Sequence, residues 1–269
     1  MINNNSDKGR NIFKSKMFRF IFEYALSIGV FILIWKVYVD VSGVPEYMMP
    51  QPKAVFHRLG QMIATGEIWQ HFWVTTGEIF LGYILGTLLG IFFGYLLEKS
   101  KYLKDALMPY LIFAQTAPKI ALVPLFVMWF GLGLTSKLVL IVSMVFFPVM
   151  EGTMLGINSI SKDVRDLMKI LNASKFQVLK EVELPSSLPM IFSGLKVGMV
   201  QAVIGAIVAE WISGKVGLGY VLIYASSTFD TVLLIAGIIF TIIVGIIFYE
   251  LINLMEKKFL YWHESQQVR

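Results

Sequence analysis

Runs of apolar residues long enough to cross a membrane are the feature that most constrains this chain. A helix that spans the hydrocarbon core of a bilayer needs about 20 predominantly apolar residues. The runs that meet this requirement predict spans at 20–39, 73–97, 109–130, 136–152, 194–212 and 231–254. We therefore expect an all-α, polytopic membrane protein with six transmembrane helices.

The composition excludes several classes of water-soluble protein. Hydrophobic residues make up 57% of the chain and charged residues 15%, whereas a soluble domain carries about 25% charged residues. This balance argues against a soluble enzyme, a disordered protein and a secreted scaffold. The absence of cysteine excludes disulfides, thiolate metal sites and thiol catalysis. The three histidines, at 57, 71 and 263, are too scattered to suggest a metal site, so we expect no metal and no cofactor.

The first apolar run decides between a membrane anchor and a cleaved leader. Residues 1–17 are polar and basic, and Phe18 to Val39 is almost continuously apolar. The apolar region of a signal peptide has only about 7–15 residues, so we interpret this longer run as a retained anchor. The predicted division of the chain is an N-terminal tail at 1–17, a transmembrane domain at 18–258 and a C-terminal tail at 259–269.

Basic residues are distributed unevenly between the two sides of the predicted bundle. With six spans, the termini and two loops share one side, in segments 1–19, 98–105, 153–190 and 256–269. These segments hold 16 Lys and Arg residues, whereas the loops on the other side hold 4. Cytoplasmic loops carry such an excess of basic residues. We therefore expect a protein of the cytoplasmic membrane with both termini in the cytoplasm, and we interpret the net charge of +5 as a sign of orientation rather than of nucleic-acid binding.

Two of the predicted spans carry a small residue at every fourth position. Such a stripe lies on one helix face and lets a second backbone come close. The stripes are Gly82, Gly86, Gly90 and Gly94 in the second span, and Gly194, Gly198, Ala202 and Ala206 in the fifth. We expect these helices to pack closely in a compact bundle.

Each stripe is continued by a carboxylate. Glu78 precedes Gly82 by four residues, and Glu210 follows Ala206 by four. Ionisable groups inside spans are costly and usually face the protein interior or a water-filled path. Two interpretations therefore stay open for both residues: lining of a translocation path, and a structural hydrogen bond to a neighbouring helix.

Lys119 is the exceptional residue of the third span, because it lies between two helix-interrupting prolines, Pro118 and Pro124. It could bind an anion, or pair with one of the two carboxylates. Equally, it could mark a helix that starts later, with Lys119 near the cytoplasmic face. An ion pair or an interfacial position is the favoured interpretation. The candidate translocation path consists of Glu78, Gln115, Lys119, Gln201 and Glu210.

The longest polar stretch inside the bundle, 151–190, predicts two short helices rather than a flexible linker. Apolar residues recur at helical spacing over 163–171. Asn172 tolerates the left-handed conformation that ends helices. Ser174 is suited to cap a second helix at 175–182.

Two prolines follow the second of these helices. We expect Leu184-Pro185 to stop it and Pro189 to lie at the start of the next span. The resulting helix–turn–helix would lie on the cytoplasmic face. It could dock in the groove of a partner protein or rest on lipid headgroups as an amphipathic connector.

The same stretch resembles the EAA loop of ABC importer permeases, whose pattern is Glu-Ala-Ala, three residues, Gly, nine residues and Ile-x-Leu-Pro. Asp166 stands at the Glu position, Asn172 at the Gly position and Val182 at the Ile position, and Leu184-Pro185 matches. The Glu-Ala-Ala itself is degenerate. The resemblance implies an ATPase-coupling loop that contains Asp166, Leu167, Met168, Leu171, Asn172, Ala173, Ser174, Phe176, Leu184 and Pro185.

Residues 71–258, most of the chain, are similar to permeases of the nitrate/sulfonate/taurine branch. The further segments of this resemblance are Pro118–Gly133, Phe146–Pro148, Ala209–Glu210, Gly217–Tyr220 and Phe229–Thr231. The resemblance implies the transmembrane domain of a type I (MetI-like) importer that carries a small organic or anionic nutrient. The same branch includes importers of pyrimidine-type thiamine precursors, which are the alternative substrate class.

The resemblance also implies partners. These are a second permease, expected to be identical, two copies of an ATP-binding subunit, and an extracellular substrate-binding protein. The chain itself has no P-loop, because its only Gly-Lys pair, Gly214-Lys215, is followed by Val rather than Ser or Thr. We therefore expect a transport subunit that is not itself an enzyme.

An ion-coupled secondary transporter is the second alternative, with Glu78, Lys119 and Glu210 as a relay. Such transporters often contain inverted repeats. The halves 1–135 and 136–269 show no repeat, and the amphipathic loop has no role in that scheme. Co-purification of an ATPase would distinguish the two classes.

Overall fold

The computed structural model describes residues 5–261, apart from the side chains of 5–21, 24 and 25. This part of the chain is helical and contains no strand. Its elements are α1 (Asn5–Ser42), α2 (Pro52–Ala64), α3 (Glu67–Lys99), α4 (Lys101–Thr116), η1 (Lys119–Leu122), α5 (Val123–Phe130), α6 (Leu134–Asn158), α7 (Lys162–Ile170), α8 (Lys175–Val178), η2 (Leu179–Glu183), α9 (Leu184–Ser213), α10 (Leu218–Ser227) and α11 (Thr231–Phe259). Of the predicted tails, 1–4 and 262–269 lie outside the described residues.

Four helical stretches among the described residues are long and apolar enough to cross a membrane. They are Glu67–Lys99, Leu134–Asn158, Lys175–Ser213 and Thr231–Phe259. The bent pair of α4 with η1 and α5 brings the number to as many as five. The first predicted span, 20–39, lies within α1, several of whose side chains are not described, so this count does not test it.

The third predicted span, 109–130, is two helices rather than one. α4 ends at Thr116, and the chain turns through 83° before it continues as η1 and α5. Pro118 lies at the turn and has no backbone N–H to continue the α4 ladder. Pro124 lies in the first turn of α5, where a helix tolerates proline.

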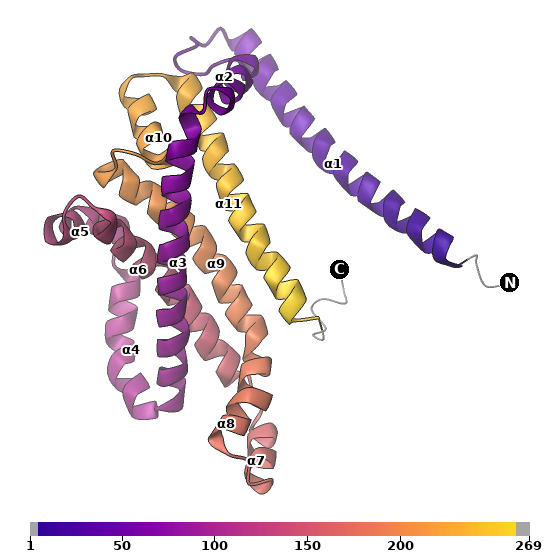
Figure 1. Ribbon diagram of the computed structural model, residues 1–269, viewed down its shortest axis with the longest axis vertical. Helices are drawn as coiled ribbons and strands as arrows, with labels where there is room; N and C mark the ends of the chain where they lie inside the picture. The colour runs from indigo at the N-terminus through magenta and orange to yellow at the C-terminus, as the bar shows by residue number, and fades with distance from the viewer. Residues whose placement is uncertain (1–4, 262–269) are drawn as a thin grey trace.

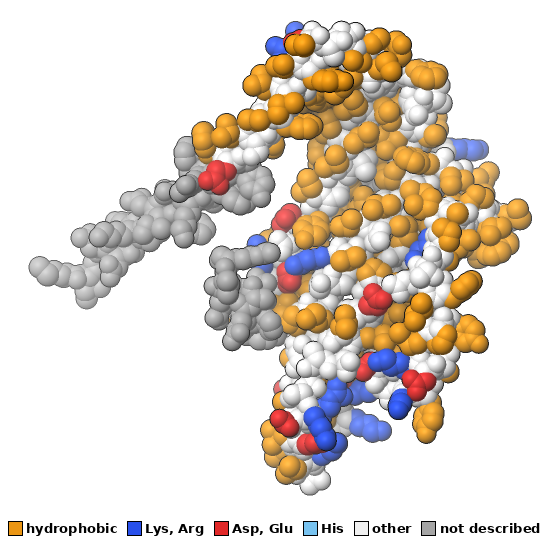
Figure 2. Space-filling model, turned by 180° about the vertical axis from the view of Figure 1, so that it is seen from behind, with side chains coloured by type: hydrophobic (Ala, Val, Ile, Leu, Met, Phe, Trp, Pro, Cys, Tyr) orange, Lys and Arg blue, Asp and Glu red, His pale blue; other side chains and the backbone are white. Residues whose placement is uncertain are grey.

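The long helices run side by side, with α7 and α8 at one end of the bundle and α10 at the other (Figure 1). α1 stands away from the bundle and contacts it at α2. Apolar side chains cover much of the face opposite to that view, and charged side chains gather near the end that carries α7 (Figure 2). This distribution is the one expected of a bundle embedded in lipid with one charged end in water.

Helix α6 lies between α3 and α9, and the glycine stripes of both helices face it. On α3, the stripe packs along Ile141, Val145, Val149 and Thr153 of α6. On α9, a Cβ added at Gly194 would lie 2.5 Å from the carbonyl oxygen of Pro148. The predicted packing role of these glycines agrees with these contacts, since any larger residue would push two backbones apart.

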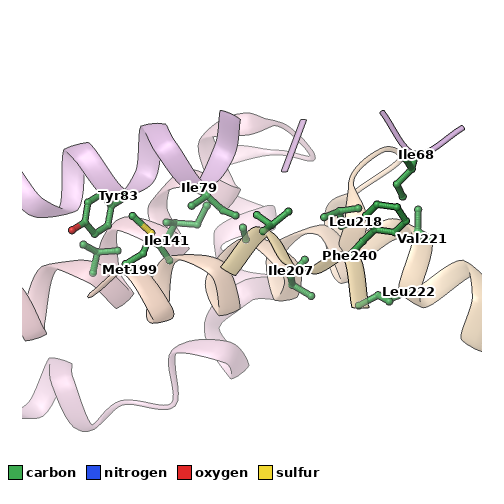
Figure 3. Close-up of a cluster of buried hydrophobic side chains, with 14 of the residues drawn as sticks. Ile68, Ile79, Tyr83, Ile141, Met199, Ile207, Leu218, Val221, Leu222 and Phe240 are labelled. Carbon is green, nitrogen blue, oxygen red and sulfur yellow. The ribbon is translucent and has the colours of Figure 1, made fainter. Parts of the chain in front are cut away.

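An apolar core continues this packing toward the α10 end. Side chains from α3, α6 and α9 meet there with side chains from α10 and α11 (Figure 3). The labelled members are Ile68, Ile79, Tyr83, Ile141, Met199, Ile207, Leu218, Val221, Leu222 and Phe240. The short helix α10 thereby becomes part of the bundle, although it is too short to span a membrane.

Two glycines of α3 give a direct test of the packing. In Gly90→Ala the new Cβ would lie 2.8 Å from Cβ of Val149 and 2.9 Å from the carbonyl oxygen of Phe146. We expect this overpacking to destabilise the purified protein by about 1–3 kcal/mol, measured by thermal unfolding. Gly77→Ala is the matched control, since nothing lies within 4 Å of its added Cβ. Alanine favours helices over glycine, so this control should be neutral or slightly stabilising. Equal loss in both variants would contradict the packing role.

Candidate functional site

A polar cleft of about 600 Å³ opens between the α4–η1 break, α6 and α9. Four polar side chains line it: Gln115, Lys119, Glu151 and Gln201. Its apolar walls include Met144, Phe147 and Ile204. Clefts of this size with a few converging polar groups are typical of small-molecule sites.

The break in the third span places Lys119 in the cleft. Because α4 stops before Pro118, the last carbonyl groups of α4 have no N–H groups of a following turn to bind. The ammonium group of Lys119 donates to one of them, the carbonyl oxygen of Gln115, at 2.9 Å. Lysine often satisfies the end of a helix in this way, where the helix dipole is negative.

The cleft holds one cation and one anion that do not pair with each other. The Lys119 ammonium lies 4.7 Å from the centre of the Phe147 ring, a cation–π contact. The side-chain amide of Gln115 donates to Glu151 at 2.9 Å. Neither charged group has an ion-pair partner in the described part of the chain. The cleft can therefore bind a ligand that brings charges or hydrogen-bonding groups of its own.

Three of the predicted path residues, Gln115, Lys119 and Gln201, share this cleft, although they come from three elements. Sequence reasoning missed Phe147 and Glu151. Glu151 lies near the end of the span predicted at 136–152, and the sequence analysis gave it no role. α6 continues to Asn158, which places Glu151 well inside the helix.

Glu78 lies outside the cleft and is held by an ion pair. Its carboxylate accepts a hydrogen bond from the ammonium group of Lys137 on α6 at 2.5 Å, and both side chains are over 90% buried. The count of basic residues placed Lys137 in the loop 131–137, although the span predicted at 136–152 also contains it; α6 begins at Leu134 and includes it. The ion pair of Lys119 with Glu78, one of the two favoured interpretations of Lys119, is therefore not formed.

Glu210 also lies outside the cleft, where it binds the start of α10. It accepts hydrogen bonds from the Thr75 hydroxyl and from the Gly219 N–H, both at 2.6 Å. The Thr75 oxygen in turn accepts from the Leu218 N–H at 2.7 Å. A carboxylate is favourable at a helix N-terminus because the first N–H groups and the helix dipole attract it. Of the two interpretations left open for Glu210, the structural hydrogen bond is the one observed.

The N-terminus of α10 depends on two further residues. The N–H of Gly217 donates to Nδ1 of His71 at 3.1 Å. Gly217 has φ of +128°, and a side chain there would collide with the Glu210 carboxylate. The histidines were considered only as metal ligands, so this contact was missed. Together with the Lys137 ion pair, these contacts join α3, α6, α9 and α10 at the end away from α7.

The predicted helix–turn–helix is present. α7 covers Lys162–Ile170, and Asn172 has φ of +50°, in the left-handed region. This conformation explains why a glycine or asparagine suits the position. Ser174 and Gln177 form a reciprocal capping box at the start of α8. The turn exposes an apolar tip, formed by Leu167, Ile170, Leu171 and Phe176.

Leu184-Pro185 does not stop the second helix, which corrects the sequence prediction. The chain is helical from Lys175 to Ser213. The segment Leu179–Glu183 is a π-helical turn, and Pro185 follows in the first turn of α9. The wider turn changes the hydrogen-bond register just before the proline, which cannot donate, so the helix continues without a break. Pro189 lies inside α9 rather than at its start.

Arg165 connects the helix–turn–helix to the cleft-lining helix. Its guanidinium donates to the carbonyl oxygen of Ile157 at 2.6 Å and to that of Ile160 at 3.4 Å. Ile157 belongs to the last turn of α6, where a cation complements the free carbonyl groups. Arg165 therefore joins α7 to the last turn of the helix that carries Phe147 and Glu151.

The comparisons with known proteins agree with this architecture. Residues 86–261 match the family described as the binding-protein-dependent transport system inner membrane component. The chain belongs to this family. It is a permease subunit of an ABC transporter, with the helical membrane domain expected from the resemblance.

Named relatives cover nearly the whole chain. The riboflavin transport permease RibX of Chloroflexus aurantiacus is 32% identical over 89% of this chain and 90% of its own. The formylaminopyrimidine transport permease ThiX of Halalkalibacterium halodurans is 31% identical over 91% and 97%. The taurine transport permease TauC of Escherichia coli is 29% identical over 91% and 92%. These substrates differ in size and charge, although the permeases are alike.

The buried ion pair of this permease gives a second test. Lys137→Met leaves the Glu78 carboxylate buried without its partner, and such losses cost about 3–5 kcal/mol. We expect a correspondingly large fall in thermal stability of the purified permease. The double variant Lys137→Met/Glu78→Met should recover most of it, because no unpaired charge remains. Lys215→Met is the control, since Lys215 is exposed in the loop between α9 and α10. A loss in the double variant as large as in the single one would refute the pairing argument.

Proposed function

We propose that two identical copies of this permease form the translocation path of an importer, with the cleft of each copy beside that path. The observation that carries the proposal is Lys119, a cation at a break in a span, without a carboxylate partner among the described residues. Ionisable groups within spans usually face a water-filled path or a ligand, because lipid solvates them poorly. Two ATP-binding subunits and an extracellular substrate-binding protein complete the proposed assembly.

The proposed cargo is a small organic or anionic nutrient of the sulfonate or taurine type. Lys119 favours a ligand with an anionic group, and the taurine permease TauC is among the relatives. A thiamine-precursor pyrimidine is the alternative cargo. The amides of Gln115 and Gln201 favour it, because they can both donate and accept hydrogen bonds, and ThiX is a relative of similar identity.

An ion-coupled transporter is not supported. Its relay requires Lys119 to act with Glu78 and Glu210, but Glu78 pairs with Lys137 and Glu210 binds α10. The family of the chain is one of ATP-driven transport components that work with binding proteins.

In the proposed orientation, the α7 end lies in the cytoplasm together with both termini. The excess of basic residues on that side and the charged end of the bundle in Figure 2 support it. The apolar tip formed by Leu167, Ile170, Leu171 and Phe176 then docks in a groove of the ATP-binding subunit. Movement of this tip reaches the cleft through Arg165 and α6.

Lys119 is tested by uptake into vesicles that contain the complete transporter. The nutrient is first identified by a thermal-shift screen of the binding protein with taurine, formylaminopyrimidine and riboflavin. We expect Lys119→Ala to lower uptake at least about tenfold, which corresponds to one charge-assisted contact, while ATPase assembly is kept. Lys119→Arg should restore part of the uptake, because it retains the cation. Lys36→Ala is the control for loss of a lysine elsewhere in the membrane domain. Uptake that is unchanged in Lys119→Ala would refute the role of this lysine.

Arg165 is tested through coupling rather than through uptake alone. We expect Arg165→Ala to lower the number of substrate molecules transported per ATP by about tenfold, since two hydrogen bonds from a charged group are lost. Arg165→Lys should lie in between. The control is Lys169→Ala on the same helix, because Lys169 is exposed and, in the described part of the chain, pairs only with Asp166 of α7. Unchanged coupling in Arg165→Ala with normal thermal stability would exclude the proposed link.

A further inference from the structure

A second cavity lies on the α7 side of the bundle and has a different character. It is a groove of about 350 Å³ between α3 and α9, with α6 at its floor and η2 at its end. Its walls are almost entirely apolar and include Leu88, Phe92, Leu179 and Ile191. The groove is separate from the polar cleft, with which it shares no lining residue.

One buried polar atom in this groove has no hydrogen-bond partner. Glu183, the last residue of the π-helical turn, lines the groove with a side chain that is only 5% exposed. One of its carboxylate oxygens pairs with Lys99 at the end of α3. The other oxygen, Oε2, is buried and has no partner among the described residues. Because a buried acceptor without a donor is unfavourable, the site favours an occupant that supplies one.

The position of the groove along the bundle points to the class of that occupant. Eleven residues separate Leu88 from Lys99 on α3, or about 16 Å at 1.5 Å per residue. This is about half of the 30 Å hydrocarbon core, the depth of one lipid leaflet. The apolar walls and the Lys99–Glu183 pair together cover a length that fits one leaflet, with the ion pair at the end that would meet the headgroups. Lys99 is 38% exposed in its side chain, so its ammonium group can still donate toward a headgroup.

We propose that this groove is a binding site for a phospholipid with a primary ammonium headgroup, of the phosphatidylethanolamine type. One acyl chain lies along Leu88 and Phe92. The headgroup lies across the ion pair, so that its phosphate accepts from Lys99 and its ammonium donates to Oε2 of Glu183. The π-helical turn η2, which lines the groove, follows the helix–turn–helix directly in sequence. A lipid bound in the groove therefore contacts the turn that joins α8 to α9.

The choice of headgroup follows from hydrogen-bond donors. A primary ammonium carries three N–H donors, whereas the trimethylammonium of phosphatidylcholine carries none. The acyl chains of the two lipids therefore fit the groove equally well. The lipids differ only in whether the headgroup can donate a hydrogen bond to Glu183. This difference makes the proposal testable without any knowledge of the transported nutrient.

The experiment is native mass spectrometry of the delipidated, intact transporter, titrated with phosphatidylethanolamine or phosphatidylcholine of identical acyl chains. We expect the wild type to retain phosphatidylethanolamine about tenfold better than phosphatidylcholine, which is the effect of one charge-assisted hydrogen bond. Glu183→Leu should abolish this preference. Leu88→Trp should weaken retention of both lipids, because the indole fills the groove.

Two controls separate lipid binding from structural damage. Leu89→Trp introduces the same side chain one residue further along α3, where it faces another cavity, and should leave retention unchanged. Lys99→Met removes the ion pair but keeps the acceptor, so it should retain a preference for the ammonium lipid. Equal retention of both lipids by the wild type, as expected if only water occupies the groove, would overturn the proposal. So would a preference that persists in Glu183→Leu.

Discussion

The close contact of α6 with α3 and α9 is the constraint on which the rest of the molecule depends. In lipid, apolar side chains gain little from leaving the solvent, so helices associate through close packing of small residues. The glycine faces of α3 and α9 allow this packing on two sides of α6. The remaining side of α6 is left to the more loosely packed α4–α5 pair. Phe147 and Glu151 lie on that side, which places the cleft between α6 and α4, a helix without a buried residue.

Buried charge is the second constraint, and it separates structural residues from functional ones. Glu78 has Lys137, and Glu210 has the Thr75 hydroxyl and the start of α10. These bonds hold helices together at the end away from α7, although Oε2 of Glu78 is buried without a hydrogen-bond partner among the described residues. Lys119 donates to the carbonyl oxygen of Gln115 but has no carboxylate partner in the described part of the chain, and Oε2 of Glu183 has no hydrogen-bond partner there. Uncompensated polar groups are costly in a low-dielectric environment, and both lie where we place a ligand.

Several local features could be predicted from the sequence because they depend on nearby residues. The break before Lys119 follows from Pro118, and the turn at Asn172 follows from the conformations that asparagine tolerates. The spacing of the α3 glycines indicated a packing face. The predictions that were wrong involve distant partners or register. An ion pair of Lys119 was one of the favoured interpretations, but Glu78 pairs with Lys137 of another helix. Pro185 was expected to end a helix, because the π-helical turn before it has no clear sequence signal.

The sequence by itself determined that this chain is a helical membrane protein and a member of a permease family. Apolar run length, basic-residue bias and motif spacing are local properties, and they do not depend on which helices become neighbours. Only the tertiary structure decided which polar residues act together. Lys119 and Gln201 share a cleft, whereas Glu78 and Glu210 do not reach it. The reason is physical: a buried polar group is defined by the partner that packing brings to it, and that partner lies on another helix.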